Sequence, residues 1–478
     1  MKLLKTIFIF EWRQLCRQGW LLSGLCLFLA VSLLSVYSGN RTVGKRWVQA
    51  DSVREAYHKD FEAALKRFTD TSTSKGKAEA KTAGMAAVIN FRLPQHAVKY
   101  PEPLAALSLG LTDIRPWHEQ VRYVKNYNDA TEMPVNNPMT LFAGNFDLAF
   151  VIIYFLPLLV LAYCYSLYSS EKEAGTLAML AVQAGSVARV VRLKLLFRFL
   201  VLAALLLVVN GLGFVLAEKR AAPGVPQMLL WCLFSLLYLL FWLGIAYFIV
   251  AFRQGATATG MYLAACWMLV LVILPSLANT IVQQRHSLPL KDEIAAYRRH
   301  QSEEIWNTPA RILSDSFNRY NPQYASTADP AKDTLHLSTR YVAGYYDLLE
   351  RRMERVIAPY EREIEDRNRQ LAALSAWNPA SVAQQWLNTL AGTELPAYDQ
   401  FSRQADQFQR SWKTFLYDFH IPGKQLQAAD LERFPVFRYQ PPELPVRGML
   451  YQAFMLFCGL CVLFATGSFV FNGKDQAS

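Results

Sequence analysis

The segment from Glu171 to Leu177 (Glu-Lys-Glu-Ala-Gly-Thr-Leu) is the most distinctive group of charged residues in the chain. It follows a long apolar block directly, and a second apolar run and the pair Gly185-Ser186 come after it. Glycine admits backbone conformations that other residues resist, so Gly175 predicts a sharp change of direction between the helix that leaves the membrane and a short helix that lies across it. A charged knob of this kind suits docking to a soluble protein better than catalysis.

The residue types on either side of Gly175 indicate different surroundings. We expect Glu171 and Glu173 to pair with cations on a docking partner, because both follow the apolar block at its exposed end. Basic residues before the next apolar block would hold the loop against anionic lipid. The predicted coupling residues are Glu171, Glu173, Gly175, Thr176, Leu177, Arg189 and Lys194, with Arg192 as a further basic residue. An ordinary inner loop with basic flanks is the alternative interpretation.

Other groupings of chemically active residues are weaker. Residues 39–46 (Gly-Asn-Arg-Thr-Val-Gly-Lys-Arg) approach a phosphate-binding loop, but Arg46 replaces the Ser or Thr that would hold Mg²⁺. Two clusters contain residue types that could bind a metal: Glu55/His58/Glu62 and His300/Glu303/Glu304. A metal site needs three or four converging ligands, so we interpret each cluster as a solvated helix face. We therefore expect no catalytic residues, no metal and no cofactor in this chain.

Six apolar blocks are long enough to cross a bilayer, which takes about 20 apolar residues per helix. None of them contains Asp, Glu, Lys or Arg. Pro157 and Pro275 interrupt the second and fifth blocks and predict bends there. The blocks are 20–37, 148–168, 199–217, 228–252, 256–282 and 448–471. The sequence predicts an all-α polytopic membrane protein with six transmembrane helices and two mainly helical extracytoplasmic domains.

The net charge of +11 comes from Lys and Arg that gather beside the apolar blocks, which favours a membrane surface over nucleic acid. The short loop 218–227, which must face the other way, carries only Lys219 and Arg220. This bias places both termini in the cytoplasm. A proton- or sodium-coupled transporter is disfavoured, because the blocks offer no ionisable residue that could bind the ion.

These blocks divide the chain into parts. Residues 1–38 are predicted to hold an interfacial helix and the first span, and 39–146 form domain A. Spans two to five occupy 147–283, with a cytoplasmic coupling loop at 169–198. Residues 284–446 form domain B, and 447–478 hold the sixth span and a cytoplasmic tail. All seven cysteines lie outside domains A and B, so no disulfide framework is expected there.

The two outer domains differ in how their prolines and apolar residues are spaced. Six prolines between Pro94 and Pro138 predict irregular chain in domain A. In domain B an apolar stripe from Val342 to Leu374 predicts a long helix, Asn378-Pro379 a helix start, and Gly392 its stop. A last helix is predicted from about Ala397 to Tyr417. The aromatic residues Trp377, Trp386, Trp412 and Phe415 are predicted to form a helical core.

The sequence resembles the type-2 ABC exporter permeases, in which a Glu-x-Glu-x-Gly-Thr-Leu segment after the second span forms the coupling helix region. The resemblance extends to a subfamily with long outer insertions after spans one and five and covers nearly the whole chain. It is carried by 103–110, Asn137-Pro138, 144–150, 154–158, 378–381 and 390–393 together with 171–177.

This resemblance implies a non-catalytic permease subunit in a bacterial inner membrane, in contact with lipid. Its partners would be separate ATPase subunits, which hold ATP and Mg²⁺, and a second copy or a related permease. A mechanical role on envelope proteins would suit the same architecture. A membrane-anchored receptor or scaffold, whose outer domains bind an envelope ligand, is the alternative. The sequence does not name a substrate.

Overall fold

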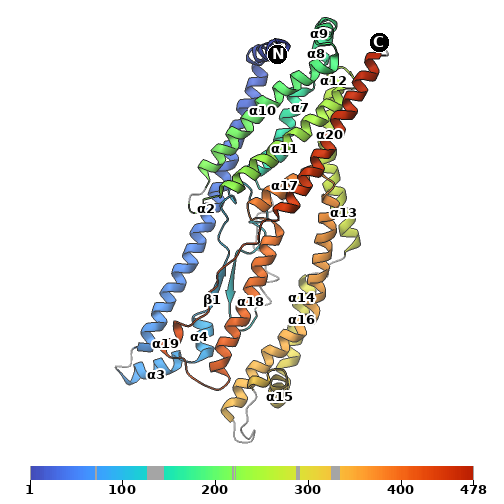
Figure 1. The fold of residues 1–478 in the computed structure, drawn as a ribbon. Coiled ribbons are helices and arrows are strands. Elements are labelled where there is room, and N and C mark those ends of the chain that lie inside the picture. The colour runs from blue at the N-terminus through green and yellow to red at the C-terminus, as the bar shows by residue number, and fades with distance from the viewer. Residues whose placement is uncertain are drawn as a thin grey trace.

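The structure is a computed structural model that describes residues 2–69, 73–125, 145–217, 220, 222–286, 291–324 and 334–476. Figure 1 shows an elongated molecule built almost entirely from helices. Asn137, Pro138 and Gly144 lie outside the described residues. The elements up to the second span are α1 (Lys2–Arg17), α2 (Gly19–Thr69), α3 (Ser74–Ala83), α4 (Ala86–Arg92), β1 (Gln95–Val98), β2 (His118–Val121), α6 (Leu148–Phe150), η1 (Val151–Phe155) and α7 (Leu156–Cys164).

The rest of the chain is helical. Its elements are α8 (Ser169–Glu173), α9 (Leu177–Ala184), α10 (Val187–Leu216), α11 (Val225–Val250), α12 (Ala256–Met268), η2 (Leu269–Ile273), α13 (Leu274–Arg285), α14 (Lys291–Trp306), α15 (Ala310–Tyr320), η3 (Pro322–Tyr324), α16 (Thr334–Ser375), α17 (Pro379–Leu390), α18 (Leu395–His420), α19 (Ala428–Leu431) and α20 (Val446–Gln476). Here η1 and η2 are π-helical turns and η3 is a 3₁₀ turn.

Six helices among the described residues are long and apolar enough to span a membrane, which confirms the predicted all-α polytopic architecture. The spans are Gly19–Thr69, Leu148–Glu173, Val187–Leu216, Val225–Val250, Ala256–Arg285 and Val446–Phe471. The first belongs to α2, a helix of 51 residues that continues far beyond the membrane. Residues 39–46, which approach a phosphate-binding loop in sequence, lie inside this helix and therefore form no loop.

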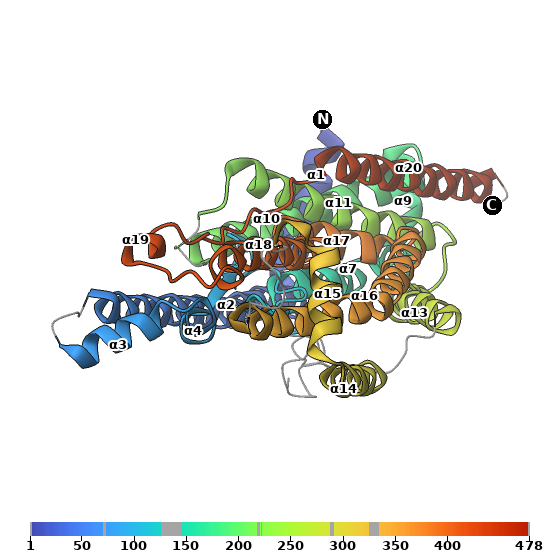
Figure 2. The same cartoon turned by 90° about the horizontal axis from the view of Figure 1, so that it is seen from below.

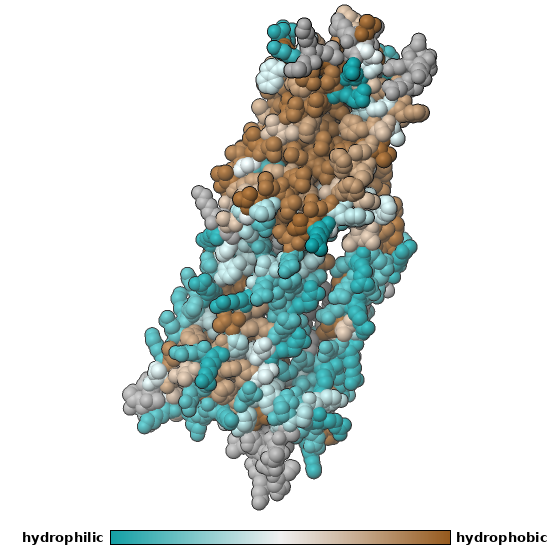
Figure 3. All heavy atoms as spheres, viewed as in Figure 1, coloured by the Kyte–Doolittle hydropathy of each residue, from teal (hydrophilic) through white to brown (hydrophobic). Residues whose placement is uncertain are grey.

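The two ends of the molecule differ in character. Figure 1 places α1, α8, α9 and the end of α20 at one end, and α3, α15 and α19 at the other. Figure 3 shows apolar surface over the spans and polar surface over the end of the molecule that holds α3, α15 and α19. We call the end with α1, α8 and α9 the inner end and the opposite one the outer end.

Span four, α11, lies at the centre of the bundle. It packs against α7, α10, α17 and α20 (Figure 2, which views the molecule from its outer end). Trp231, Tyr238 and Trp242 of this helix are fully buried in the main core. Span five is the least buried of the six, so most of its apolar surface faces outward.

Domains A and B share one core. Ile89, Leu93 and Tyr123 of domain A pack in the same apolar cluster as Phe401 and Trp412 of domain B. The cluster also receives partly buried side chains from the outer half of α2. Within domain A, β1 and β2 pair antiparallel, with Gln95 opposite Val121. This short ladder was missed by the sequence prediction, which saw only the prolines around it.

The predicted helices of domain B are present as α16, α17 and α18, and Pro359 lies inside α16. A small second core joins α14, α15 and α16. Trp412 is fully buried in the core of the outer domains, and Phe415 packs against that core partly buried, as predicted. Trp386 is also fully buried, but in the core of the spans. The prediction is wrong for Trp377, which is 88% exposed because it lies in the turn between α16 and α17.

Candidate coupling site

The loop at residues 169–198, which the sequence predicts to couple to an ATPase, contains two short helices and two left-handed glycines. Helix α8 continues span two to Glu173, and Gly175 then turns the chain with φ +69°. Helix α9 follows and ends at Gly185, whose φ is +79°. The Ser186 hydroxyl accepts from the Arg189 amide and caps α10. The change of direction predicted at Gly175 is therefore present.

A buried ion cluster lies directly beneath this loop. The Lys194 ammonium is 2.5 Å from a Glu171 carboxylate oxygen and 2.9 Å from one of Glu11. The Arg198 guanidinium lies 3.5 Å from the other Glu11 oxygen. Thr176 donates its hydroxyl to the Glu171 carboxylate. The cluster thus joins helix α1, the end of span two and the start of span three.

This geometry corrects two expectations about charge. Glu171 does not face outward toward a partner's cations, because its carboxylate is occupied by Lys194 and Thr176. Lys194 does not lie at a lipid surface, because its side chain is only 3% exposed. Taking a charge out of water is costly unless it is paired, so these residues bind one another. Arg189 and Arg192 remain exposed, as expected.

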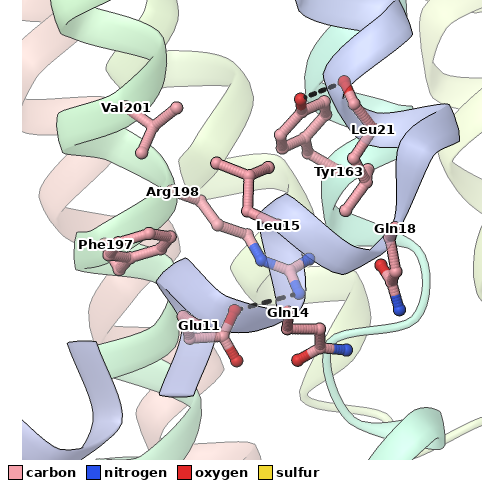
Figure 4. Close-up of a pocket in the computed structure, with 9 residues that line it drawn as sticks. All are labelled: Glu11, Gln14, Leu15, Gln18, Leu21, Tyr163, Phe197, Arg198 and Val201. Carbon is pink, nitrogen blue, oxygen red and sulfur yellow. Dashed lines mark hydrogen bonds and ion pairs between the residues drawn. The ribbon is translucent and has the colours of Figure 1, made fainter. Parts of the chain in front are cut away.

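Beside the cluster is a cavity of about 20 Å³, large enough for about one water molecule. Figure 4 shows the Glu11 carboxylate and Arg198 guanidinium pointing toward each other, with Gln14 and Gln18 around them. The side chains that line it are Glu11, Gln14, Leu15, Gln18, Leu21, Tyr163, Phe197, Arg198 and Val201. On the far side, the Tyr163 hydroxyl donates to the Leu21 carbonyl over 2.6 Å, which links span two to span one.

The loop presents a mixed surface at the inner end of the molecule. Lys172, Glu173 and Gly175 are exposed. On α9, Met179 is 59% and Val182 is 84% exposed, whereas Leu177 packs against the span core. Apolar side chains flanked by charges on a projecting helix are suited to docking against another protein. Of the predicted residues, Glu173 and Gly175 belong to this surface, and Glu171, Thr176 and Lys194 to the cluster beneath it.

Spans two and five share an irregularity at the predicted prolines. In each, a π-helical turn comes immediately before a Leu-Pro pair, at Pro157 and at Pro275. Proline lacks an N–H, so it leaves a helix carbonyl without its usual donor. In span two the N–H of Leu156 bonds the carbonyl of Val151, so in this π pattern Pro157 leaves the Ile152 carbonyl without its donor. The Tyr238 hydroxyl donates to the neighbouring Ile153 carbonyl at 2.9 Å.

In span five the missing donor comes from domain B. The N–H of Leu274 bonds the carbonyl of Leu269, so in this π pattern residue 275 would bond Val270. Pro275 has no N–H, and the Asn378 amide donates to the Val270 carbonyl instead, at 2.8 Å. The outer domain thus reaches the irregular turn of span five.

Several motifs that are distant in sequence meet in one joint between the spans and the outer domains. The Leu109 amide donates to the Asp147 carboxylate at 2.7 Å, and the Leu111 amide to the Thr393 carbonyl at 3.0 Å. The Thr393 hydroxyl donates to the Ser108 carbonyl at 3.0 Å. Burial raises the pKa of Asp147 to about 6. The segments 103–110, 145–150 and 390–393 therefore form one hydrogen-bonded unit.

The backbones in this joint approach closely. A Cβ atom added at Gly39 of α2 would lie 1.9 Å from the Ala106 carbonyl oxygen, so a side chain there would force the two segments apart. Gly110 has φ +48° and its Cα packs against Thr393. Glycine at these positions lets α2, domain A and domain B share one contact.

Sequence reasoning gave no side-chain contact to three residues that the structure places in polar networks: Glu11, Asp147 and Asn378, the last of which it identified only as a helix start. Glu11 had a visible signal, because Ile7, Glu11 and Leu15 recur every four residues and all three are buried. A carboxylate within an apolar helical stripe predicts a buried cationic partner. Which cation that is depends on tertiary packing, which no local pattern specifies.

Comparison with protein families agrees with this architecture. A family model described as ABC-2 family transporter protein matches residues 5–330, which is more than half of the chain. A second, described as Domain of unknown function (DUF3526), matches residues 282–440. Searches of curated proteins and of solved structures gave no significant match. With its six apolar spans and its match over spans one to five, the chain belongs to the ABC-2 family of transporter proteins, as a multi-pass permease subunit of an ABC transporter.

Proposed function

We propose that this permease serves an ATP-driven exporter, or an ABC complex that acts on the bacterial envelope. Its coupling loop, residues 169–198, would bind a separate ATPase subunit that holds ATP and Mg²⁺, and would move when that subunit changes conformation. Two copies, or this chain and a related permease, would pair in the inner membrane with both termini in the cytoplasm. The substrate stays undefined.

The observation that carries this proposal is the placement of the ion cluster under an exposed loop. Met179 and Val182 offer an apolar docking face, and Glu173 adds charge beside it. Directly below, Lys194 holds Glu171 of span two and Glu11 of the interfacial helix together. A push on α9 would therefore reach helix α1 and spans two and three as a unit rather than deform a soft loop.

The same movement has a route toward the outer end. Spans two and five carry π-helical turns before Pro157 and Pro275, where their helices lack a regular hydrogen-bond ladder. Rotation of the span bundle could be absorbed at these turns and passed to the outer joint at Asp147 and Thr393. A substrate would leave along the interface between two permeases, lined by spans two and five.

The docking face can be tested with a matched pair of variants. Val182→Glu places a charge on the exposed face of α9, and Val436→Glu makes the same change at an outer residue that is 75% exposed. We expect Val182→Glu to lose its co-purified ATPase while Val436→Glu retains it, with both variants inserted in the membrane at wild-type level. An ATPase that co-purifies equally with both would place docking elsewhere. If no ATPase co-purifies with the wild type, the receptor or scaffold function would be favoured.

A further inference from the structure

Two histidines of domain A meet on the ladder formed by β1 and β2. The register places Val98 opposite His118, so His96 is a diagonal neighbour of His118 on the same face of the ladder. The His96 Nδ1 and His118 Nε2 atoms lie 2.8 Å apart. The two residues are 22 positions apart in the chain, so no local pattern joins them, and neither belongs to the two clusters considered in the sequence.

Aromatic side chains and one carboxylate surround this pair. β1 lies beside α2 (Figure 1), and the Tyr57 ring of that helix is 6.0 Å from the His96 ring. Just before β2, the Trp117 ring is 5.5 Å from the His118 ring. Asp60 follows Tyr57 by about one turn of α2, and its charge acts on His96. The pair is thus half-buried between aromatic rings, with an anionic group within electrostatic reach.

Both imidazoles are neutral at about pH 7 because their pKa values are lowered. Burial, with a smaller effect of His96, lowers the pKa of His118 to about 4. Burial also lowers the pKa of His96, although the charge of Asp60 opposes this. In a neutral pair at 2.8 Å, one ring donates its N–H to the lone pair of the other. Neutral imidazole nitrogens are the commonest metal ligands in proteins, and this pair places two of them side by side.

The spacing suits two ligands of one metal ion. Imidazole nitrogens lie about 2.0–2.1 Å from a bound Zn²⁺, so two of them at a ligand angle of about 90–110° are about 2.8–3.4 Å apart. The observed 2.8 Å is at the short end of this range. The ring centroids are 5.1 Å apart, so the two nitrogens point at each other, and each ring must turn to direct its lone pair at a shared ion. Among the residues that the structure describes, no third His, Cys, Asp or Glu completes a ready-made site.

We propose that His96 and His118 bind one divalent transition-metal ion of the class that prefers imidazole, namely Zn²⁺, Ni²⁺ or Cu²⁺. Asp60 supplies a third ligand after a change of rotamer, and water fills the remaining positions. The ring that donates its proton in the metal-free pair takes the other tautomer, so both facing nitrogens carry lone pairs and no net proton is released. Mg²⁺ and Ca²⁺ do not bind, because they prefer oxygen ligands. This inference does not depend on the ATPase or on the direction of transport.

A metal ion at this place would act on the outer joint. β1 continues directly into Lys99, whose ammonium donates to the Gly392 carbonyl at 3.0 Å. Gly392 precedes Thr393, which bonds the Ser108 carbonyl in that joint. By linking β1 to β2, the ion would fix the strand that leads to the joint. The site is therefore suited to stabilise domain A in response to metal at the outer end of the molecule.

Titration of the full chain with Zn²⁺ tests the proposal. The tag-free protein is purified in detergent, freed of metal with a chelator and titrated in a calorimeter at neutral pH. His96→Gln and His118→Gln each remove one ligand, and Asp60→Asn removes the third. His58→Gln is the matched control, because His58 is an exposed histidine on α2. We expect micromolar binding by the wild type and by His58→Gln, unaffected by excess Mg²⁺. Binding by His96→Gln and His118→Gln should be weaker by at least roughly tenfold, since even the outer-shell partners of metal ligands are worth about that much. Asp60→Asn should lose less. Equal binding by the wild type and both histidine variants, or no micromolar binding by the wild type, would overturn the proposal.

A second measurement maps the site in the unaltered chain, so it does not depend on how well a variant folds. Diethyl pyrocarbonate modifies neutral imidazoles, and mass spectrometry reports the reaction at each histidine. We expect Zn²⁺ to protect His96 and His118 together and to leave His58 as reactive as before. Excess Mg²⁺ should protect none of the three. If His96 and His118 react at the same rate with and without Zn²⁺, the metal is bound elsewhere, for example by the cysteines of the spans, and the proposal is wrong.

Discussion

The Lys194 ammonium lies 2.9 Å from the Glu11 carboxylate, although Glu11 belongs to helix α1 and Lys194 to the start of span three. Both side chains are almost fully buried, and Lys194 also holds Glu171. A buried cation between two carboxylates makes each of the three helices depend on the other two. The loop at residues 169–198 thus rests on this charge cluster. Removing any one member of the cluster should lower the stability of the folded protein.

Removing the central cation should therefore destabilise the inner end of the bundle. Lys194→Met leaves two buried carboxylates facing one remaining cation, and we expect a loss of about 3–5 kcal/mol in unfolding free energy. Arg192→Met, an exposed cation two residues away, should stay within about 0.5 kcal/mol of wild type. Thermal unfolding of the purified proteins in one detergent measures both.

The double variant Glu11→Gln with Lys194→Met provides the internal check. It restores charge balance between Glu171 and Arg198, so its destabilisation should be smaller than the sum of the two single changes. Strict additivity of the three melting shifts would show that Glu11 and Lys194 do not interact in the folded protein.

The glycine at the turn of the coupling loop is expected to matter for its backbone alone. Gly175 has φ +69° and open space around its Cα, so Gly175→Ala should cost about 1 kcal/mol without any clash. Gly211 lies in α10 with equally open space and no left-handed φ, and Gly211→Ala should be neutral or slightly stabilising. Unfolding midpoints that shift in the same direction for both variants would contradict this.

ATPase binding and coupled activity should also depend on the turn at Gly175. Gly175→Val together with Glu173→Lys alters the loop surface but spares the cluster, whereas Glu171→Lys would place a second lysine beside Lys194. We expect the first pair to insert normally and to lose ATPase co-purification or coupled activity. Full activity with normal ATPase binding would mean that the loop is an ordinary connection.

The sequence predicted the spans well because lipid imposes a strong and local requirement. Any helix that crosses the bilayer must be apolar over about 20 residues, and this can be read from one segment at a time. The turn at Gly175 and the helix start at Asn378-Pro379 are also local, since each depends on the backbone preference of one or two residues.

The charge cluster and the exposure of Trp377 could not be predicted in the same way. Glu171 and Lys194 were expected on the surface because charged residues usually are, and only packing of α1 against spans two and three buries them. Trp377 looks like a core residue by type, but its exposure depends on where α16 ends and how the chain turns into α17. Burial of this kind belongs to the tertiary structure and not to a residue pattern.

Domain B is expected to need domain A in order to fold. Phe401 and Trp412 share their core with Ile89, Leu93 and Tyr123, and the Gln409 amide donates to the Tyr123 carbonyl at 3.0 Å. A fragment of residues 288–440 should therefore keep helical far-ultraviolet dichroism but lack a fixed near-ultraviolet aromatic signal. Fusion of residues 40–125 to it should restore that signal. A fragment that unfolds cooperatively without domain A would contradict the shared core.

The orientation of the two ends can be checked in intact cells. Ser74 of α3 and Ser411 of α18 are exposed at the outer end, and Lys172 is exposed at the inner end. In a cysteine-free background, Ser74→Cys and Ser411→Cys should react with an impermeant thiol reagent before lysis. Lys172→Cys should react only after lysis. The opposite pattern would invert the proposed topology.

A buried carboxylate at the outer joint should make stability depend on pH. Glu394 is 9% exposed, and one of its carboxylate oxygens has no hydrogen-bond partner among the described residues. Burial raises its pKa from 4.5 to about 7, opposed by the charge of Lys99 and reinforced by that of Glu102. Burial likewise raises the pKa of Glu102 and lowers that of Lys99.

The sign follows from where the proton binds more tightly. Between pH 4.5 and about 7 the folded protein holds the Glu394 proton and the unfolded chain does not, so stability from this group falls as pH rises through that window. The change is up to about 3 kcal/mol, at roughly 1.4 kcal/mol per pKa unit. Glu394→Gln removes the titration while keeping the shape of the side chain. We expect wild type and variant to have similar melting temperatures at pH 5, and the variant to be the more stable of the two at pH 8. Parallel melting curves across this range would mean that Glu394 is already ionised in the folded protein near pH 5.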